Sequence, residues 1–333
     1  MTTQAHTLRA ARPDDAGQIA DLFQLVYAES SHPCKSLEFV AQTLRRRHAD
    51  VWHIGAQGDR ITGCMGMLPH RWNRSWEFVR AVTHPEFRGS GLATELAQRA
   101  IDDAWASDDC DLIVGFPRSR TIYRIISEMV TPGMKLTGHD GGINIAGGRR
   151  EYHLVAVSFA KQKRFARVVP DSSLATTIPF VKEAILDPLD LPRTSGVYPP
   201  ALITGEHPHH PDYGPFTFHY HPFCPSDSLE ITAYTGPKHD PVEIAADLMR
   251  TLDSFAYARH VRMAVLADKL PFQRALQSAG FAMTAYLPAW HLQNGIRYDC
   301  VLMTRRTSAE EPADHGTRDL IDYFNAGYAT CLS

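Results

Sequence analysis

The chain has 333 residues, of which 44% are hydrophobic and 21% charged, and its net charge is -3 with a pI of 6.6. These values are typical of a globular protein of about two domains, and they exclude an overall basic field for nucleic acid or an anionic membrane. The first residues lack the apolar core of a signal peptide, and no apolar run reaches the ~20 residues of a membrane span. The six cysteines form no C-x-x-C pair and are predicted to be free thiols, so we expect a cytoplasmic protein.

Strands and helices are predicted to alternate through the first half. Strands show apolar alternation, and helices show apolar residues three and four positions apart. In chain order we expect a strand at 7–12, helices at 13–27 and up to about 47, a hairpin at 51–68, a strand at 75–83, a helix at 92–105, a strand at 110–116, a helix at 119–129, and strands near 142–147 and 151–159.

The second half is predicted to repeat this order. We expect a short helix at 179–186, strands at 217–221 and 228–234, a helix at 241–257, a strand at 261–267, a helix at 271–280, a strand pair at 281–290 and 297–306, and a polar tail with a short amphipathic helix. The order strand–helix–strand–helix–strand–strand therefore occurs twice, at 76–159 and at 229–305. Such alternation predicts an α/β layered fold.

The segment HPEFRGSG, residues 84–91, joins a predicted strand to a predicted helix. A helix N-terminus favours phosphate, because its N–H groups are unpaired and its dipole is positive there. Gly89 and Gly91 would let the backbone turn its amides toward an anion, Arg88 has donor geometry suited to phosphate, and Ser90 could add a hydroxyl or cap the helix. The alternative is a turn that merely contains two glycines. The Walker pattern is absent, and no G-x-G-x-x-G follows the first strand.

The segment VTHPEFRGSGLA resembles the acyl-CoA-binding motif R/Q-x-x-G-x-G/A of the GNAT (GCN5-related) N-acyltransferases, which Arg88, Gly91 and Ala93 match. The element order over residues 7–160 is similar to that family, and the order over 229–305 resembles its C-terminal part. The resemblance implies an α/β fold with a mixed sheet, built as two GNAT-like domains in tandem. The implied domains are 1–160, the acyl-CoA-binding catalytic domain, 161–306, a degenerate GNAT-like domain without the CoA loop, and 307–333, a C-terminal tail.

The resemblance implies acetyl-CoA or another acyl-CoA as co-substrate, and no metal. Backbone amides around Val82 and Thr83 would hold the pantetheine arm and polarise the thioester carbonyl, between splayed parallel strands at 76–83 and 111–116. The residues implied to bind the cofactor are Val82, Thr83, Arg88, Gly89, Ser90, Gly91, Leu92, Ala93, Thr94 and Ser119.

The equivalent stretch of the second half, AYTGPKHDPVEIAADL, lacks the arginine and the paired glycines. Asp240 is a natural N-cap, Pro241 fits the first helical turn, and Glu243 completes a capping box. These residues would satisfy the amides that a phosphate needs and would repel it. We therefore expect a single cofactor site, in the first half, with the second half either structural or walling the acceptor pocket.

The resemblance also implies direct attack by an acceptor amine, assisted by a general base. Glu77 is the predicted base, because many relatives carry a glutamate eight residues before the equivalent of Pro85; the alternative is an exposed strand carboxylate. Many relatives protonate the leaving thiolate with a tyrosine four residues before a Gly-Phe pair, and here that position, before Gly133, is Met129. Tyr123 is the replacement candidate, with simple packing as its alternative role.

Two further segments supply candidate residues. The loop between the first two helices contributes Glu29, His32 and Cys34 as acceptor-site candidates, with Cys34 expected to be an inert thiol. In GEHPHHPDYGPFTFHYHPF, His219 and His221 would share one strand face. No cysteine or carboxylate completes a ligand set there, so we expect a polar loop with strand histidines, or a lining of the acceptor pocket, and no metal.

These observations predict an N-acyltransferase that moves an acyl group, with acetyl as the first expectation, from acyl-CoA to the amine of a small molecule. One alternative is a GNAT-like enzyme with an acyl-carrier-protein donor, for which KQKRFAR (161–167) is the basic docking patch, unless that segment is a solvated linker. The other is a non-catalytic acyl-CoA-binding module. Neither nucleic acid nor membrane is an expected partner, and a monomer or a homodimer fits the sequence equally well.

Overall fold

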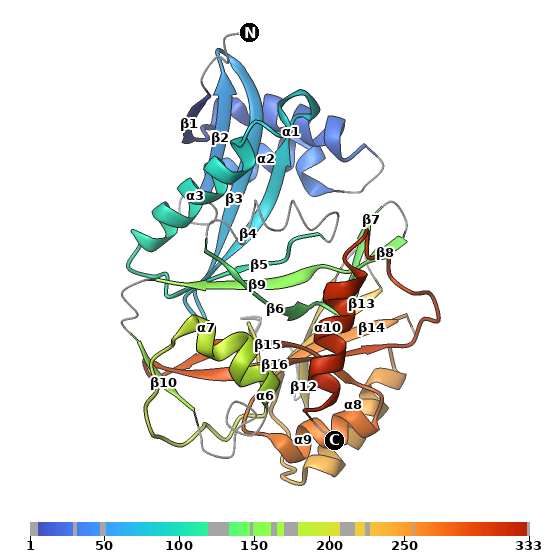
Figure 1. Ribbon diagram of the computed structural model, residues 1–333. Helices are drawn as coiled ribbons and strands as arrows, with labels where there is room; N and C mark the ends of the chain where they lie inside the picture. Colours follow the sequence, from blue (N-terminus) through green and yellow to red (C-terminus); the bar gives the residue numbers. More distant parts are fainter. Residues whose placement is uncertain are drawn as a thin grey trace.

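The computed structural model describes residues 6–28, 32–46, 51–118, 133–146, 149–160, 165–169, 179–206, 217–223, 227–255 and 257–331. Fourteen strands of these residues form one continuous sheet that runs through both halves of the chain. Its main path is β1-β2-β3-β4-β5-β9-β6-β15-β16-β14-β13-β12, with β10 and β11 paired to β16 and β14. Figure 1 shows the N-terminal strands at the top and the C-terminal strands below them.

The first half follows the predicted order of strands and helices. Its elements are β1 (Thr7–Ala10), η1 (Pro13–Asp15), α1 (Ala16–Val26), η2 (Pro33–Lys35), α2 (Leu37–Arg45), β2 (Val51–Gln57), β3 (Arg60–His70), β4 (Ser75–Thr83), η3 (Pro85–Phe87), α3 (Leu92–Trp105), β5 (Leu112–Gly115), β6 (Lys135–His139), β7 (Asn144–Ala146), β8 (Arg149–Glu151) and β9 (Leu154–Phe159). β4 and β5 are parallel, and β9 lies between β5 and β6. The helix predicted at 119–129 lies outside the described residues.

The strand predicted at 142–147 is present as β7, at 144–146, but it does not belong to the main sheet. The strand that pairs with β9 is β6, and residues 144–146 pair instead with 149–151 in a separate hairpin. Two consecutive glycines with positive φ, Gly141 at 77° and Gly142 at 81°, turn the chain out of the sheet. The Asp140 carboxylate holds this turn, because it accepts hydrogen bonds from the amides of Gly142 and His153, both at 2.9 Å.

The second half repeats the pairing of the first. Its elements are β10 (Ala166–Val168), α6 (Pro179–Val181), η5 (Lys182–Leu186, a π-helical turn), α7 (Asp187–Leu189), β11 (Ile203–Thr204), β12 (Phe218–Phe223), β13 (Ser228–Tyr234), α8 (Pro241–Asp253), β14 (His260–Leu266), α9 (Leu270–Ser278), β15 (Ala282–Gln293), β16 (Ile296–Arg306) and α10 (Arg318–Ala329). The path β12-β13-β14-β16-β15 matches β3-β4-β5-β9-β6, including one parallel pair. The halves meet where β6 pairs with β15. The helix predicted at 241–257 ends at Asp253.

The first half has one helical layer on each face of its sheet. α1 and α2 pack on one face of β2–β4 and α3 packs on the other. Figure 1 shows these helices on opposite sides of the strands. Trp76 and Phe78 of β4 belong to the core beneath α3, so Glu77 between them points to the opposite face.

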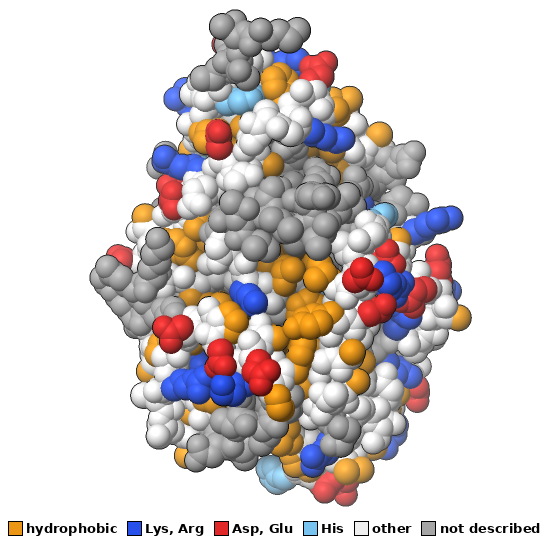
Figure 2. Space-filling view, viewed as in Figure 1, with side chains coloured by type: hydrophobic (Ala, Val, Ile, Leu, Met, Phe, Trp, Pro, Cys, Tyr) orange, Lys and Arg blue, Asp and Glu red, His pale blue; other side chains and the backbone are white. Residues whose placement is uncertain are grey.

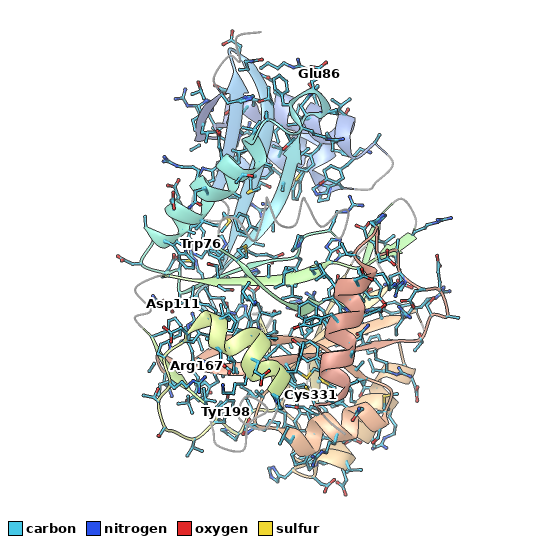
Figure 3. All side chains as sticks on the ribbon, in the orientation of Figure 1. Trp76, Glu86, Asp111, Arg167, Tyr198 and Cys331 are labelled. Atoms are coloured by element: carbon cyan, nitrogen blue, oxygen red, sulfur yellow. The ribbon has the colours of Figure 1, made fainter. Side chains whose placement is uncertain are left out.

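Buried ion pairs join distant segments near the seam between the halves. Arg167 and Asp299 are fully buried, and the guanidinium Nε of Arg167 donates to Asp299 Oδ1 over 2.6 Å. Arg297, also fully buried, donates to the Asn73 carbonyl at 2.7 Å and to Asp111 at 2.9 Å, both in the first half. Figure 3 places Arg167 beside Tyr198, below Asp111. Arg167 is the last residue of the segment 161–167, which was predicted to be an exposed basic patch or a solvated linker. Because Arg167 is buried against the Asp299 carboxylate, it belongs to neither.

The predicted amphipathic helix of the tail is α10, and it packs across the seam. The Tyr328 hydroxyl accepts from the Tyr286 amide of β15 at 2.9 Å and donates to the Thr137 carbonyl of β6. On the face that carries α10, acidic and basic side chains are interspersed, with no wide area of one sign (Figure 2). Among the described helices, none has the length and apolar character needed to cross a membrane.

Candidate active site

The parallel strands β4 and β5 separate at the middle of the sheet. Their pairing ends at Phe78 and Gly115, while β4 continues to Thr83. Figure 1 shows the two strands diverging from there. The amide of His84 donates to the Thr62 carbonyl of β3 at 2.8 Å, so by strand alternation the Val82 amide also faces β3 and the Thr83 amide faces the gap. The gap predicted between 76–83 and 111–116 is present, and Thr83 offers a donor into it.

A β-bulge lies on β4 where the gap opens. Arg80 has φ of 59°, a left-handed conformation that is uncommon for a residue other than glycine. Its guanidinium lies 5.0 Å from the ring centroid of Trp52, and the Tyr27 hydroxyl donates to the Ala81 carbonyl at 3.0 Å. These contacts hold the bulge in place. A bulge re-aims the backbone beside a site, so this part of β4 is shaped by more than strand pairing.

The loop beyond β4 presents unpaired amides to solvent. Gly89 and Gly91 have φ of 80° and 88°, while no atom lies within 4 Å of a Cβ added at either position. The glycines are therefore needed for backbone conformation, not for space. Within the part of the chain that the structure describes, the amides of Gly89, Gly91 and Ala93 make no hydrogen bond. Three donors at one helix N-terminus form an anion-binding arrangement.

The side chains of the loop complete this arrangement. Arg88 is exposed and makes no ion pair with the described residues. Ser90 does not cap the helix closely: its hydroxyl donates to the Phe87 carbonyl at 2.7 Å and lies 3.4 Å from the Leu92 amide. Figure 3 shows Glu86 at the tip of the first half, far from Trp76 at the start of β4, so the loop lies at the end of the gap away from the second half.

The candidates between α1 and α2 have structural partners. His32 stacks on Phe23 with ring centroids 4.7 Å apart, and its Nδ1 accepts from the Cys34 amide at 3.2 Å. Burial, reinforced by the charges of Arg80 and other cations, lowers the pKa of His32 to about 4, so the imidazole is neutral at pH 7. Cys34 is fully buried, as expected of an inert thiol. Glu29 lies outside the described residues.

Glu77 is not an isolated strand carboxylate. His70 Nε2 lies 2.9 Å from Glu77 Oε2, and His70 Nδ1 lies 3.7 Å from Glu206 Oε2 of the second half. Burial opposes the charged imidazole, but the two carboxylates raise the pKa of His70 to about 9. At neutral pH His70 is therefore a cation between two carboxylate side chains, and one of these, Glu77, lies beside the gap.

Arg118, which sequence reasoning missed, follows β5 and reaches the same region. Its guanidinium lies 5.8 Å from the Tyr27 ring centroid and forms a two-pronged ion pair with Glu151. Burial acts against ionisation of Glu151, but His153 and Arg118 lower its pKa to about 2. His315 of the C-terminal segment also contacts Glu151 at 3.1 Å. No local pattern could have revealed a contact that joins four distant segments.

The second half also opens a gap, between β13 and β14, but the chain fills it. Pairing of these parallel strands ends at Ile231 and Met263, and β11 then pairs with β14 through Ile203–Thr204. A Cβ added to Gly205 would lie 2.8 Å from Thr232 Cβ of β13. Residues 202–205, here called the plug, thus occupy the space between the two strands.

The helix after the second gap is capped by its own side chain. The Asp240 carboxylate accepts from the amides of Val242 and Glu243, both at 2.9 Å, and Pro241 occupies the first helical turn. The predicted N-cap is confirmed, and these amides are not available to an anion.

The remaining candidate residues add no catalytic or metal-binding group among the described residues. Ser119 and Tyr123 lie outside the described residues, as do His207, His209 and His210. His219 lies 3.3 Å from the Thr235 hydroxyl, and His221 Nε2 lies 2.9 Å from the Glu206 carbonyl oxygen. No metal-binding cluster of histidine, cysteine or acidic residues occurs among the residues described.

Comparison with known families decides the nature of the first half. Residues 17–117, which span α1 to β5, match the model of the Acetyltransferase (GNAT) family. Residues 17–117 thus belong to a GNAT-like domain at the N-terminus of the chain. The protein is accordingly an acyltransferase, and the fold is a mixed α/β fold with this domain at its N-terminus. No curated protein sequence matches the chain significantly.

Solved GNAT structures resemble about half of the chain. The ribosomal-protein-S5-alanine acetyltransferase of Vibrio fischeri is 15% identical, with a TM-score of 0.42, and the match covers 49% of this chain and 98% of that one. Spermidine N-acetyltransferase of Vibrio cholerae, in complex with CoA and spermine, is 19% identical, with a TM-score of 0.41 and coverage of 49% and 99%. A Salmonella typhimurium acetyltransferase with acetyl-CoA is 17% identical, with a TM-score of 0.40 and coverage of 47% and 95%.

Proposed function

We propose that this protein transfers an acyl group, most simply acetyl, from acyl-CoA to the amine of a small molecule by direct attack. The observation that carries the proposal is the gap beside β4, which leads from the Thr83 amide to the unpaired amides of the glycine loop. This juxtaposition provides donors for a thioester at one end and for phosphates at the other.

The residues of the loop fit the phosphates of acyl-CoA. The amides of Gly89, Gly91 and Ala93 and the Arg88 guanidinium are all donors, and no carboxylate caps the helix that follows. Ser90, Leu92 and Thr94 adjoin these donors, while Val82 lies in the wall of the gap. Acyl-CoA would supply the activated acyl group, and the protein would supply its orientation.

The chemistry requires a neutral amine and a polarised thioester carbonyl. The Thr83 amide faces the gap and would donate to the carbonyl oxygen, where negative charge develops. The amine nitrogen would bond to the carbonyl carbon as the carbon–sulfur bond breaks, with its electron pair leaving on the thiolate. Glu77, directly or through water, would take the proton that the amine loses, and the thiolate would gain a proton from solvent or an acid such as Tyr123.

We further propose that residues 161–306 form a second, degenerate GNAT-like domain that binds no cofactor, with 307–333 as a tail packed across the seam. The repeated strand order supports the relationship. The plug and the Asp240 cap support the absence of a second cofactor site. One molecule of acyl-CoA per chain is expected.

Calorimetric titration with acetyl-CoA and CoA tests the proposal. Wild type should bind near one site per chain, Arg88→Glu and Gly91→Glu should not bind, and Arg274→Glu, an exposed charge reversal on α9, should bind like wild type. Release of CoA thiol on addition of an amine should follow. Absence of binding by wild type would overturn a free acyl-CoA donor, and an acyl carrier protein would then be tested in its place. Binding without thiol release would indicate a non-catalytic binding module.

A further inference from the structure

The plug does more than fill the second gap, because the residue directly after it is charged and reaches the other half. Leu202 accepts from the Leu266 amide at 3.0 Å and Gly205 lies against Thr232, so the plug is held on both sides. Glu206 follows directly, and His221 lies 2.9 Å from its carbonyl oxygen. The position of Glu206 is therefore set by the fold of the second half.

Glu206 enters the surroundings of the predicted base. His70 lies between the two carboxylates, 2.9 Å from Glu77 and 3.7 Å from Glu206. Because both carboxylates contact the same imidazole, they lie close enough together to contact one bound ammonium group. The exposed fraction of the Glu206 side chain is 59%, against 25% for Glu77, so Glu206 is the more accessible of the two.

A second ion pair closes the cluster from the other half. Glu230 occupies the third position of the paired segment of β13, as Glu77 does in β4, and it contacts Arg262 of β14 at 2.9 Å. Arg262 in turn lies 5.7 Å from the Phe116 ring centroid, just beyond β5. We call His70, Glu77, Glu206, Glu230 and Arg262 the seam cluster; it brings three carboxyl side chains together with one imidazole and one guanidinium.

We propose that Glu206 is an acceptor-binding residue of the first half's site, and that with Glu77 it selects a cationic amine bearing no carboxylate beside the reacting nitrogen. This proposal rests on the proposed acyltransferase function. It assigns the second half a direct part in the reaction: the segment that blocks a second cofactor site also completes the acceptor site. The carboxylates of Glu77 and Glu206, which converge on His70, would attract an ammonium group and repel an amino-acid carboxylate.

The test compares Glu206→Gln with Glu183→Gln, which removes the same charge from an exposed position of the same half. Initial rates at saturating acetyl-CoA would be measured with butane-1,4-diamine, butylamine and glycine. Wild type should prefer the diamine and use glycine least. Glu206→Gln should raise the KM for the diamine about tenfold, as expected for loss of one charged contact, with kcat changed less than about twofold. Glu183→Gln should match wild type.

Two direct measurements separate failure of this inference from failure of the proposed function. Calorimetry should give the same acetyl-CoA affinity for wild type and Glu206→Gln, and it should show diamine binding to the CoA complex of wild type that weakens in Glu206→Gln. Equal diamine affinity and KM in both variants, or a preference of wild type for glycine, would overturn the role of Glu206 while leaving the acyltransferase intact. If wild type did not bind acetyl-CoA, the proposed function would be overturned instead.

Discussion

The two halves of the sheet each contain a gap between parallel strands, and the chain treats these gaps in opposite ways. In the first half the gap beside β4 contains no other described strand, and the loop beyond it has unpaired amides. In the second half β11 pairs along β14 in the equivalent place. The comparison teaches that strand order alone does not make a cofactor site; the residues at the next helix N-terminus and the segment beside the strands decide it.

The starts of the two helices show this difference at single residues. Gly91 precedes α3 with φ of 88° and no side chain, whereas Asp240 precedes α8 and bonds two amides with its own carboxylate. A carboxylate at an N-cap uses the donors that a phosphate would need and carries the same charge. The predictions below test how far each half depends on these features.

The largest effect is expected at the buried ion pair of the second half. Asp299→Asn should lower the free energy of unfolding by about 3–5 kcal/mol, because Arg167 would remain buried without its counter-charge. Asp187→Asn, which removes an exposed partner of Lys182, should cost less than about 1 kcal/mol. Urea denaturation measures both. A loss at Asp299 no greater than at Asp187 would mean that the buried pair does not stabilise the second half.

Exchanging the residues that precede α3 and α8 tests directly whether they decide which half binds the cofactor. Gly91→Asp should weaken acetyl-CoA binding at least about a hundredfold, equivalent to about 2.7 kcal/mol, because a carboxylate would replace the phosphate on the amides and strain a left-handed position. Asp240→Gly should leave the stoichiometry at one, since the plug still fills the second gap. Calorimetry measures both variants; a second site in Asp240→Gly would show that the cap alone blocks it.

A substitution in the plug, in the second half, should change acceptor binding at the site of the first half. Gly205→Ala places a Cβ 2.8 Å from Thr232 Cβ and should cost about 1–3 kcal/mol of unfolding free energy. It should also raise the acceptor KM, because Glu206 is displaced, while acetyl-CoA affinity stays unchanged. Gly17→Ala, where nothing lies within 4 Å, is the control and should not destabilise. An acceptor KM unaffected by Gly205→Ala would separate the plug from the acceptor site.

The smallest effect is expected in the titration of His70. Its pKa of about 9 exceeds the unfolded value of 6.5, so its ion pairs stabilise the protein fully below pH 6.5, progressively less as pH rises, and not at all above about 9. Glu206→Gln should lower this pKa by about one unit, equivalent to about 1.4 kcal/mol. NMR titration of the imidazole measures it. An unchanged midpoint in Glu206→Gln would show that the 3.7 Å contact carries no charge interaction.

Prediction from sequence succeeded where structure is set by neighbours along the chain. The strand at 75–83 and the helix at 92–105 have the predicted bounds, because their side-chain periodicity is strong and their boundaries fall at turn residues. The Asp240 cap was predictable for the same reason. The strand predicted at 142–147 is present as β7, but the sequence did not reveal β6 before it, nor that two glycines turn β7 out of the main sheet into a separate hairpin.

The contact between His70 and Glu77 was within reach of sequence reasoning but was missed. The hairpin of β3 and β4 pairs His70 with Ser75 and Leu68 with Glu77, so the two residues are diagonal neighbours on adjacent strands. Arg118, Glu206 and Arg262 were not within reach, because their partners lie dozens to more than a hundred residues away and depend on how the halves meet.

By itself, the sequence determined the alternation of strands and helices, the glycine loop with Arg88, and the capped helix that lacks such a loop, because each depends on residues within a turn or two of one another. Only the tertiary structure decided that one sheet runs through both halves, that the plug fills the second gap, and that Glu206 lies beside His70 of the first half. These features arise from pairing between distant segments, whose free energy depends on burial and charge in the assembled fold rather than on any local pattern.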